Sequence, residues 1–135
     1  MRQIIPCILT AVYAYVIFLV SSRDTSSLPL PYHTDKLVHF AEFGLFCLLT
    51  CWSLFSIKAA SRKIFNIVIA IGITSLYGVS DEFHQSFVPH RSMDILDWLT
   101  DTAGAVTAGF LWKKIASKPQ TMEKFLAKEK TLIKM

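Results

Sequence analysis

Long apolar segments constrain this chain more than any other feature. Residues 4–20, 37–57 and 64–80 contain few ionisable side chains, and residues 95–112 are apolar apart from Asp97 and Asp101. A helix needs about 20 residues to cross a bilayer, and roughly 17 suffice. Of the 135 residues, 53% are hydrophobic and 18% are charged, a balance that favours a membrane protein over a soluble domain. We therefore predict an all-α, polytopic membrane protein with four transmembrane helices in a compact bundle.

The predicted helices cover about 4–21, 36–57, 63–82 and 94–113, so that residues 1–112 form one transmembrane domain. Residues 113–135 form a basic tail, in which apolar residues recur at helical spacing among lysines. This tail is either an amphipathic helix on the cytoplasmic surface or a solvated segment. The first segment also resembles a secretory signal peptide. Its long apolar run, with no clean cleavage site after it, favours an uncleaved helix.

The distribution of charge predicts the orientation. Four spans place the N-terminus, the loop around residues 58–63 and the tail on one side, with eleven of the fourteen Lys and Arg residues. By the positive-inside rule both termini are cytoplasmic, and the protein is a multi-pass protein of the bacterial cytoplasmic (inner) membrane. The high pI thus follows from topology, so no nucleic-acid partner is expected. The bilayer is the expected partner, and oligomer formation is left open.

Polar residues gather at the predicted outer face. Eight of the ten acidic residues and all four histidines lie near it. Ionisable groups inside or beside hydrocarbon are costly, so they indicate a function by default. The candidate catalytic residues are His39, Glu42, Asp81, Glu82, His84 and Asp97, and the candidate ligand-binding residues are Asp35, Gln85, Arg91 and Asp101.

Helical spacing joins several of these residues. Asp35, His39 and Glu42 share one face of the second helix, and Asp97 and Asp101 share a face of the fourth. At a rise of about 1.5 Å per residue, Glu42 and Asp101 each lie roughly 10 Å from the outer start of their helix. Two carboxylates at one depth cannot both remain charged without a cation, a proton or a donor between them.

Three solutions to this charge problem remain open. The first is a structural network in which His39 or Arg91 supplies positive charge. The second is a protonated carboxylate in an acid/base pair. The third is a divalent metal, for which His39, Glu42, His84 and Asp101 are residues of the right type. Because no compact signature such as HExxH occurs, we assign no metal and no other cofactor.

Two further patterns concern the third and fourth helices. The run at residues 81–85 spells DExH, but the chain has no phosphate-binding Gly-rich loop, so a helicase is excluded. This run is either the end of the third helix or a separate re-entrant turn. Ser92 is expected to cap the fourth helix, with Asp94 in its first turn. Small residues at 104, 105, 108 and 109 predict close packing and place Asp97 and Asp101 toward protein rather than lipid.

An ordered set of residues resembles the VanZ-like family of small bacterial membrane proteins. The resemblance runs from about residue 35 to residue 109 and rests on Asp35-Lys36, His39-Phe40, Glu42, Tyr77-Gly78, Ser80-Asp81-Glu82, His84-Gln85, Phe87-Val88-Pro89, Arg91-Ser92, Asp97 and Gly104. It implies a four-span plan and a link to glycopeptide (teicoplanin) sensitivity. The chain departs from the family where Asp101 replaces a usual Asn and His90 replaces a usual turn Gly.

Three functions are compatible with these observations. The first is a non-catalytic envelope protein that binds an outer-leaflet lipid-linked or glycopeptide ligand at the polar site and alters sensitivity to teicoplanin. The second is a membrane-embedded acid/base or metal-assisted hydrolase or transferase acting on a lipid-linked or phosphate-bearing envelope substrate. The third, a proton-coupled transporter, lacks polar groups through the inner half of the bundle.

Overall fold

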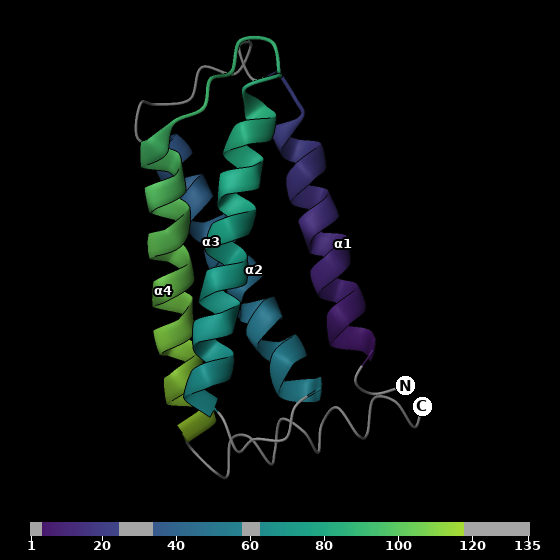
Figure 1. Cartoon of the computed structure of the whole chain (residues 1–135), viewed down its shortest axis with the longest axis vertical. Coiled ribbons are helices and arrows are strands. Elements are labelled where there is room, and N and C mark those ends of the chain that lie inside the picture. Colours follow the sequence, from purple (N-terminus) through teal and green to yellow (C-terminus); the bar gives the residue numbers. More distant parts are fainter. Residues whose placement is uncertain (1–3, 25–33, 58–62, 118–135) are drawn as a thin grey trace.

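The structure consists of four α-helices that run along the long axis of the molecule (Figure 1). It is a computed structural model, and it describes residues 4–24, 34–57 and 63–117. The helices are α1 (Ile4–Ser21), α2 (Thr34–Ile57), α3 (Lys63–Gln85) and α4 (Ile95–Ser117). The all-α prediction is confirmed. We call the end where α1 and α3 finish and α2 and α4 begin the acidic end, and the opposite end the basic end.

Three of the four helices are long and apolar enough to cross a membrane, namely α1, α2 and α3. Helix α4 has the length but not the hydropathy, because Asp97, Asp101 and several small residues interrupt its apolar sequence. The multi-pass character is therefore confirmed for three helices, and the fourth span stays a prediction.

Several helix ends differ from the predicted ones. Helix α3 continues through Gln85, so the run at 81–85 is its last part and not a separate turn. Asp94, not Ser92, caps α4: its Oδ1 accepts a hydrogen bond from the Leu96 backbone N–H at 2.8 Å. Helix α4 ends at Ser117, four residues beyond the predicted end. The predicted amphipathic helix lies in residues 118–135, outside the described part of the chain.

Helices α2 and α4 cross closely through glycines. A Cβ atom on Gly104 would clash with the Phe40 backbone carbonyl oxygen, whereas one on Gly44 would lie 3.5 Å from the Gly104 carbonyl oxygen, an ordinary contact. Gly109 also lies close to α3, where a Cβ atom would meet the side chains of Ile67 and Ile71. The predicted small-residue packing of α4 is confirmed, and it holds α4 against both neighbours.

The apolar core has two parts. One surrounds Trp112, with the buried thiols of Cys47 and Cys51 packed in it as small apolar groups. The other joins Ile17 of α1 to Phe43 and Phe46 of α2. Most of the other large apolar side chains are exposed on the outside of the bundle, where a lipid environment would cover them. The two core parts position the helices, and the polar residues gather beyond them at the acidic end.

Candidate functional site

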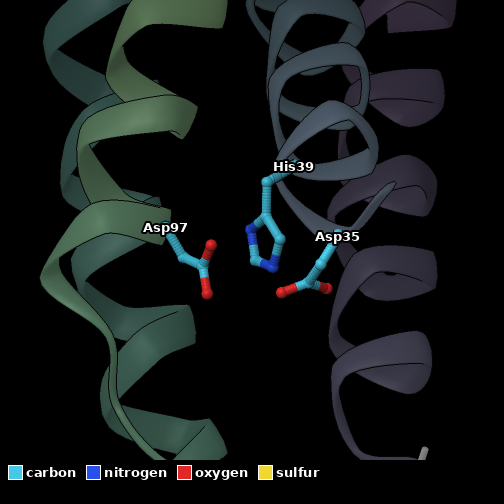
Figure 2. Close-up of side chains that lie close together, drawn as sticks. All are labelled: Asp35, His39 and Asp97. Atoms are coloured by element: carbon cyan, nitrogen blue, oxygen red, sulfur yellow. The ribbon is translucent and has the colours of Figure 1, made fainter. Parts of the chain in front are cut away.

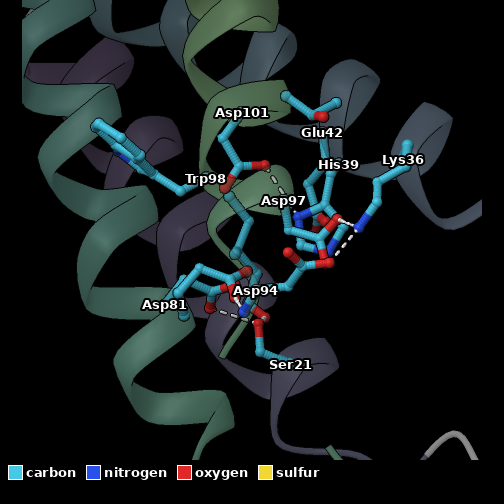
Figure 3. A network of polar contacts seen from close by, with 12 residues as sticks. Ser21, Lys36, His39, Glu42, Asp81, Asp94, Asp97, Trp98 and Asp101 are labelled. Atoms are coloured by element: carbon cyan, nitrogen blue, oxygen red, sulfur yellow. Dashed lines mark hydrogen bonds and ion pairs between the residues drawn. The ribbon is translucent and has the colours of Figure 1, made fainter. Parts of the chain in front are cut away.

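Polar side chains from all four helices converge inside the acidic end (Figure 3). Each of these residues is at most 5% exposed, although ionisable residues are rarely buried unless they are paired. The set comprises Ser21 of α1, His39 of α2, Asp81, Glu82 and Gln85 of α3, and Asp97 and Asp101 of α4. Six of these seven residues were predicted as site residues from the sequence.

His39 and Asp101 form the innermost pair. His39 Nδ1 lies 2.9 Å from Asp101 Oδ1, at hydrogen-bond distance, and the Asp101 side chain is fully buried. From their equal depth along the helices, we predicted that Asp101 and Glu42 lie next to each other. In the structure Glu42 is only half-buried and lies beside this pair, while the histidine takes the hydrogen bond (Figure 3). A contact between His39 and Asp101 is one that the network solution predicts, and the charge state of the pair stays open.

Lys36 joins the start of α2 to the start of α4. Its Nζ donates to Asp94 Oδ2 at 2.8 Å and also to Asp97 Oδ1. The Lys36 ammonium, followed by the Leu96 backbone N–H, holds the pKa of the Asp94 carboxyl below its usual range. The Asp97 side chain is 7% exposed, so Lys36 neutralises a carboxylate that has little access to solvent. Lys36 was not among the predicted site residues, although its spacing of three from His39 was a usable signal.

Asp81 links α1 to α3. Its Oδ1 accepts a hydrogen bond from Ser21 Oγ at 2.5 Å, and its Oδ2 accepts one from Gln85 Nε2 at 2.7 Å. Both carboxylate oxygens are therefore satisfied by neutral donors. The bond to Ser21 connects α3 to α1, whereas the bond from Gln85 lies within α3 and fixes the Asp81 carboxylate. Ser21 was not among the residues predicted from the sequence.

Glu82 and Asp101 each keep one buried oxygen without a partner. The Asp94 backbone N–H donates to Glu82 Oε2 at 2.8 Å, but Glu82 Oε1 and Asp101 Oδ2 have no hydrogen bond to any residue that the structure describes. Asp101 Oδ2 faces the backbone of α3 at Gly78, where a Cβ atom would lie 3.0 Å from it. The absence of a side chain at Gly78 therefore makes the space around this oxygen.

Two predicted site residues lie apart from this cluster. His84 is half-buried on the α1 side, where its Nε2 lies 2.9 Å from Ser22 Oγ and its ring centre lies 4.5 Å from that of Phe18, with the two rings tilted by 35°. Arg91 lies half-buried in the connection between α3 and α4. The turn before Arg91 has His90 in the left-handed region at φ 61°, a conformation that favours glycine, so this position accepts a side chain all the same.

Two groups of three residues have side chains suitably placed for a metal ion within the described part of the chain. Asp35, His39 and Asp97 form one group (Figure 2), and His39, Glu82 and Asp101 form the other. Within each group the donor atoms lie within 4.8 Å of one another. Of the four predicted metal candidates, His39 and Asp101 are thus brought together, whereas His84 and Glu42 belong to neither group.

A groove opens beside the network, between α2 and α4. It has a volume of about 690 Å³ and is lined by Asp35, Lys36, Asp94, Leu96, Leu99, Thr100 and Ala103. Its charged residues lie at the acidic end, and its uncharged residues, mostly apolar, follow α4 toward the middle of the bundle. We call it the α2–α4 groove. Its volume is within the range of ligand sites, roughly 300–1,000 Å³.

Comparison with known proteins identifies a family. A family model described as VanZ/LLP1 matches residues 5–117, which includes all four helices. Neither curated proteins nor solved structures gave a match.

Proposed function

Since the chain belongs to the VanZ/LLP1 family, we propose that it is a protein of the bacterial cytoplasmic membrane that binds a lipid-linked envelope ligand at the outer face. The observation that carries the proposal is the α2–α4 groove, which has a charged mouth and an apolar floor beside a buried polar network. Binding of such a ligand would change the cell's sensitivity to the glycopeptide teicoplanin. We infer this phenotype from the resemblance to the VanZ-like family.

The proposed orientation rests on charge and on lipid exposure. We place the acidic end outside and both termini in the cytoplasm, because Lys63, Lys113 and Lys114 lie at the basic end. We also propose that α4 is a fourth span. Its apolar side chains at Leu99 and Leu111 are each 50% exposed, which suits contact with lipid along its whole length.

The shape and chemistry of the groove match an amphiphile. Acyl or prenyl chains would lie along Leu96, Leu99 and Ala103, and the head group would meet Asp35 and Lys36 at the mouth. Burying apolar surface contributes about 25 cal/mol per Å², so a chain lying in the groove would supply most of the affinity. The charged residues would select the head group.

We predict that Leu99→Trp blocks the groove. Cross-linking of the purified protein to a photoactivatable phospholipid should fall at least about fivefold, because the indole fills the apolar floor. Leu111→Trp, equally exposed on the same helix near the basic end, is the matched control and should retain cross-linking. In cells, Leu99→Trp should also remove any difference in teicoplanin sensitivity and in lipid and wall-precursor profile between strains with and without the protein. Equal cross-linking of both variants would reject the groove as the ligand site.

A second candidate function is catalysis on the same class of ligand. A histidine beside two buried carboxylates with unpaired oxygens favours it. Under this alternative, Glu82→Gln should abolish the cellular phenotype while the protein still accumulates in the membrane and still cross-links to lipid. If Glu82→Gln leaves the phenotype intact, a catalytic role for this carboxylate is excluded.

A further inference from the structure

We infer that His39, Glu82 and Asp101 bind a divalent transition-metal ion inside the acidic end. Two buried carboxylate oxygens at this position lack partners in the part of the chain that the structure describes. Glu82 is 2% exposed and Asp101 0%, and each has one carboxylate oxygen with no hydrogen-bond partner among the described residues. A buried polar atom without a partner costs about 1–3 kcal/mol, and more when it is charged. A cation held by both carboxylates removes this cost.

The three side chains converge from different helices. The three side chains come from α2, α3 and α4, and their donor atoms lie within 4.8 Å of one another. His39 Nδ1 and Asp101 Oδ1 are already 2.9 Å apart. Neighbouring ligands bound at about 2.0–2.2 Å from one ion are separated by about 3 Å, so these atoms are spaced as adjacent ligands. The ion would replace the hydrogen bond between them.

The neighbouring group of Asp35, His39 and Asp97 is less suitable. Asp97 already accepts a hydrogen bond from the Lys36 ammonium. An ion bound there would compete with that ammonium and be repelled by it. The group formed by His39, Glu82 and Asp101 has no lysine or arginine hydrogen-bonded to any of its three members in the described part of the chain.

The surroundings of the three residues also fit a metal site. The Asp94 backbone N–H fixes Glu82 through Oε2 and leaves Oε1 free to bind. The missing side chain at Gly78 leaves space beside Asp101 Oδ2. A cavity of about 180 Å³ between α3 and α4 is lined by Glu82, Asp94 and Trp98 among others, so one of the three proposed ligands borders open space.

The nitrogen and oxygen donors of the three side chains indicate which metal ion would bind. One imidazole nitrogen with two carboxylates suits Zn²⁺ or Mn²⁺ better than Ca²⁺ or Mg²⁺, which prefer oxygen ligands alone. Two carboxylates also balance the charge of a divalent ion. Three protein ligands leave at least one position for water or for a phosphate oxygen of a bound ligand.

The test is metal binding by the full-length protein purified in detergent, with Zn²⁺ and Mn²⁺ each added alone. We expect about one ion per chain by elemental analysis after removal of free metal, and a raised melting temperature in excess metal. Glu82→Gln and Asp101→Asn should bind at least about 100-fold more weakly, because outer-shell partners alone are commonly worth roughly 10–100-fold in affinity. His84→Asn, which changes a histidine outside the three-residue group, is the matched control and should bind as the natural protein does.

Several results would reject the metal site. If the natural protein binds neither ion in the millimolar range, the inference is wrong. It is also wrong if Glu82→Gln remains monodisperse and binds as tightly as the natural protein. If the variants fail to fold, the test rests on the natural protein alone. Its melting temperature should then rise when metal is added, and no rise would reject the site. Lipid cross-linking to the α2–α4 groove is measured without added metal, so the two proposals can fail separately.

Discussion

Replacing Gly104 with alanine is expected to destabilise the bundle more than any other single methyl addition to its glycines. The new Cβ would clash with the Phe40 carbonyl oxygen, and it would lie 3.2 Å from the Gly44 backbone nitrogen. These atoms belong to the backbone of α2, so no side-chain rotation relieves the clash and the helices must separate. Overpacking of this kind costs about 1–3 kcal/mol, and backbone contact places the effect at the upper end. Thermal unfolding in detergent and the amount of protein in the membrane fraction measure it.

Two other glycines serve as controls. A Cβ on Gly72 meets nothing within 4 Å, so Gly72→Ala should leave the stability unchanged or raise it slightly. Gly44→Ala lies at the same crossing but makes only an ordinary contact, and it should be tolerated. If all three variants unfold at the same temperature, the close approach of α2 and α4 at Gly104 is not real.

Removing the Lys36 ammonium is expected to have the second-largest effect. Lys36→Met keeps most of the side-chain volume but leaves the Asp97 carboxylate without its cation. Breaking a fully buried pair costs about 3–5 kcal/mol. Because the Lys36 side chain is 30% exposed, solvent screens part of the interaction. We therefore expect the free energy of unfolding to fall by about 1–3 kcal/mol. The decrease in melting temperature of the purified protein measures the loss.

A double substitution separates the ion pair from simple packing. Lys36→Met combined with Asp97→Asn removes both charges, so it should recover most of the stability lost in Lys36→Met alone. Lys114→Met, at an exposed lysine near the basic end, should change little. A double variant that is less stable than Lys36→Met would show that Asp97 depends on partners other than Lys36.

Much of the fold could be predicted from the spacing of residue types along the sequence. Apolar length predicted four helices, and α1 ends where it was predicted to end. The grouping of acidic and histidine residues at one end followed from the alternating direction of successive helices. Small residues on α4 predicted its burial, which Gly104 and Gly109 confirm. Such features depend on sequence spacing, which the helical repeat converts directly into position.

The pairing inside the site could not be predicted in this way. Equal depth suggested Glu42 as the neighbour of Asp101, but His39 holds Asp101 because depth does not define how each helix is rotated about its axis. His84 lies only two residues after Glu82, yet it faces α1 while Glu82 faces α4. The capping by Asp94 was missed because Ser92 and Asp94 are both good cap residues, and tertiary contacts with Lys36 and Glu82 decide between them.

The central claim is that the acidic end opens to the outer face of the membrane, and cysteine labelling tests it most directly. In a variant whose three native cysteines are replaced by alanine, His90→Cys places a thiol in the exposed turn at the acidic end, and Ser117→Cys places one at the end of α4. A membrane-impermeant maleimide applied to intact cells should modify position 90, and it should reach position 117 only after lysis. Labelling of position 117 in intact cells, with position 90 protected until lysis, would contradict the account.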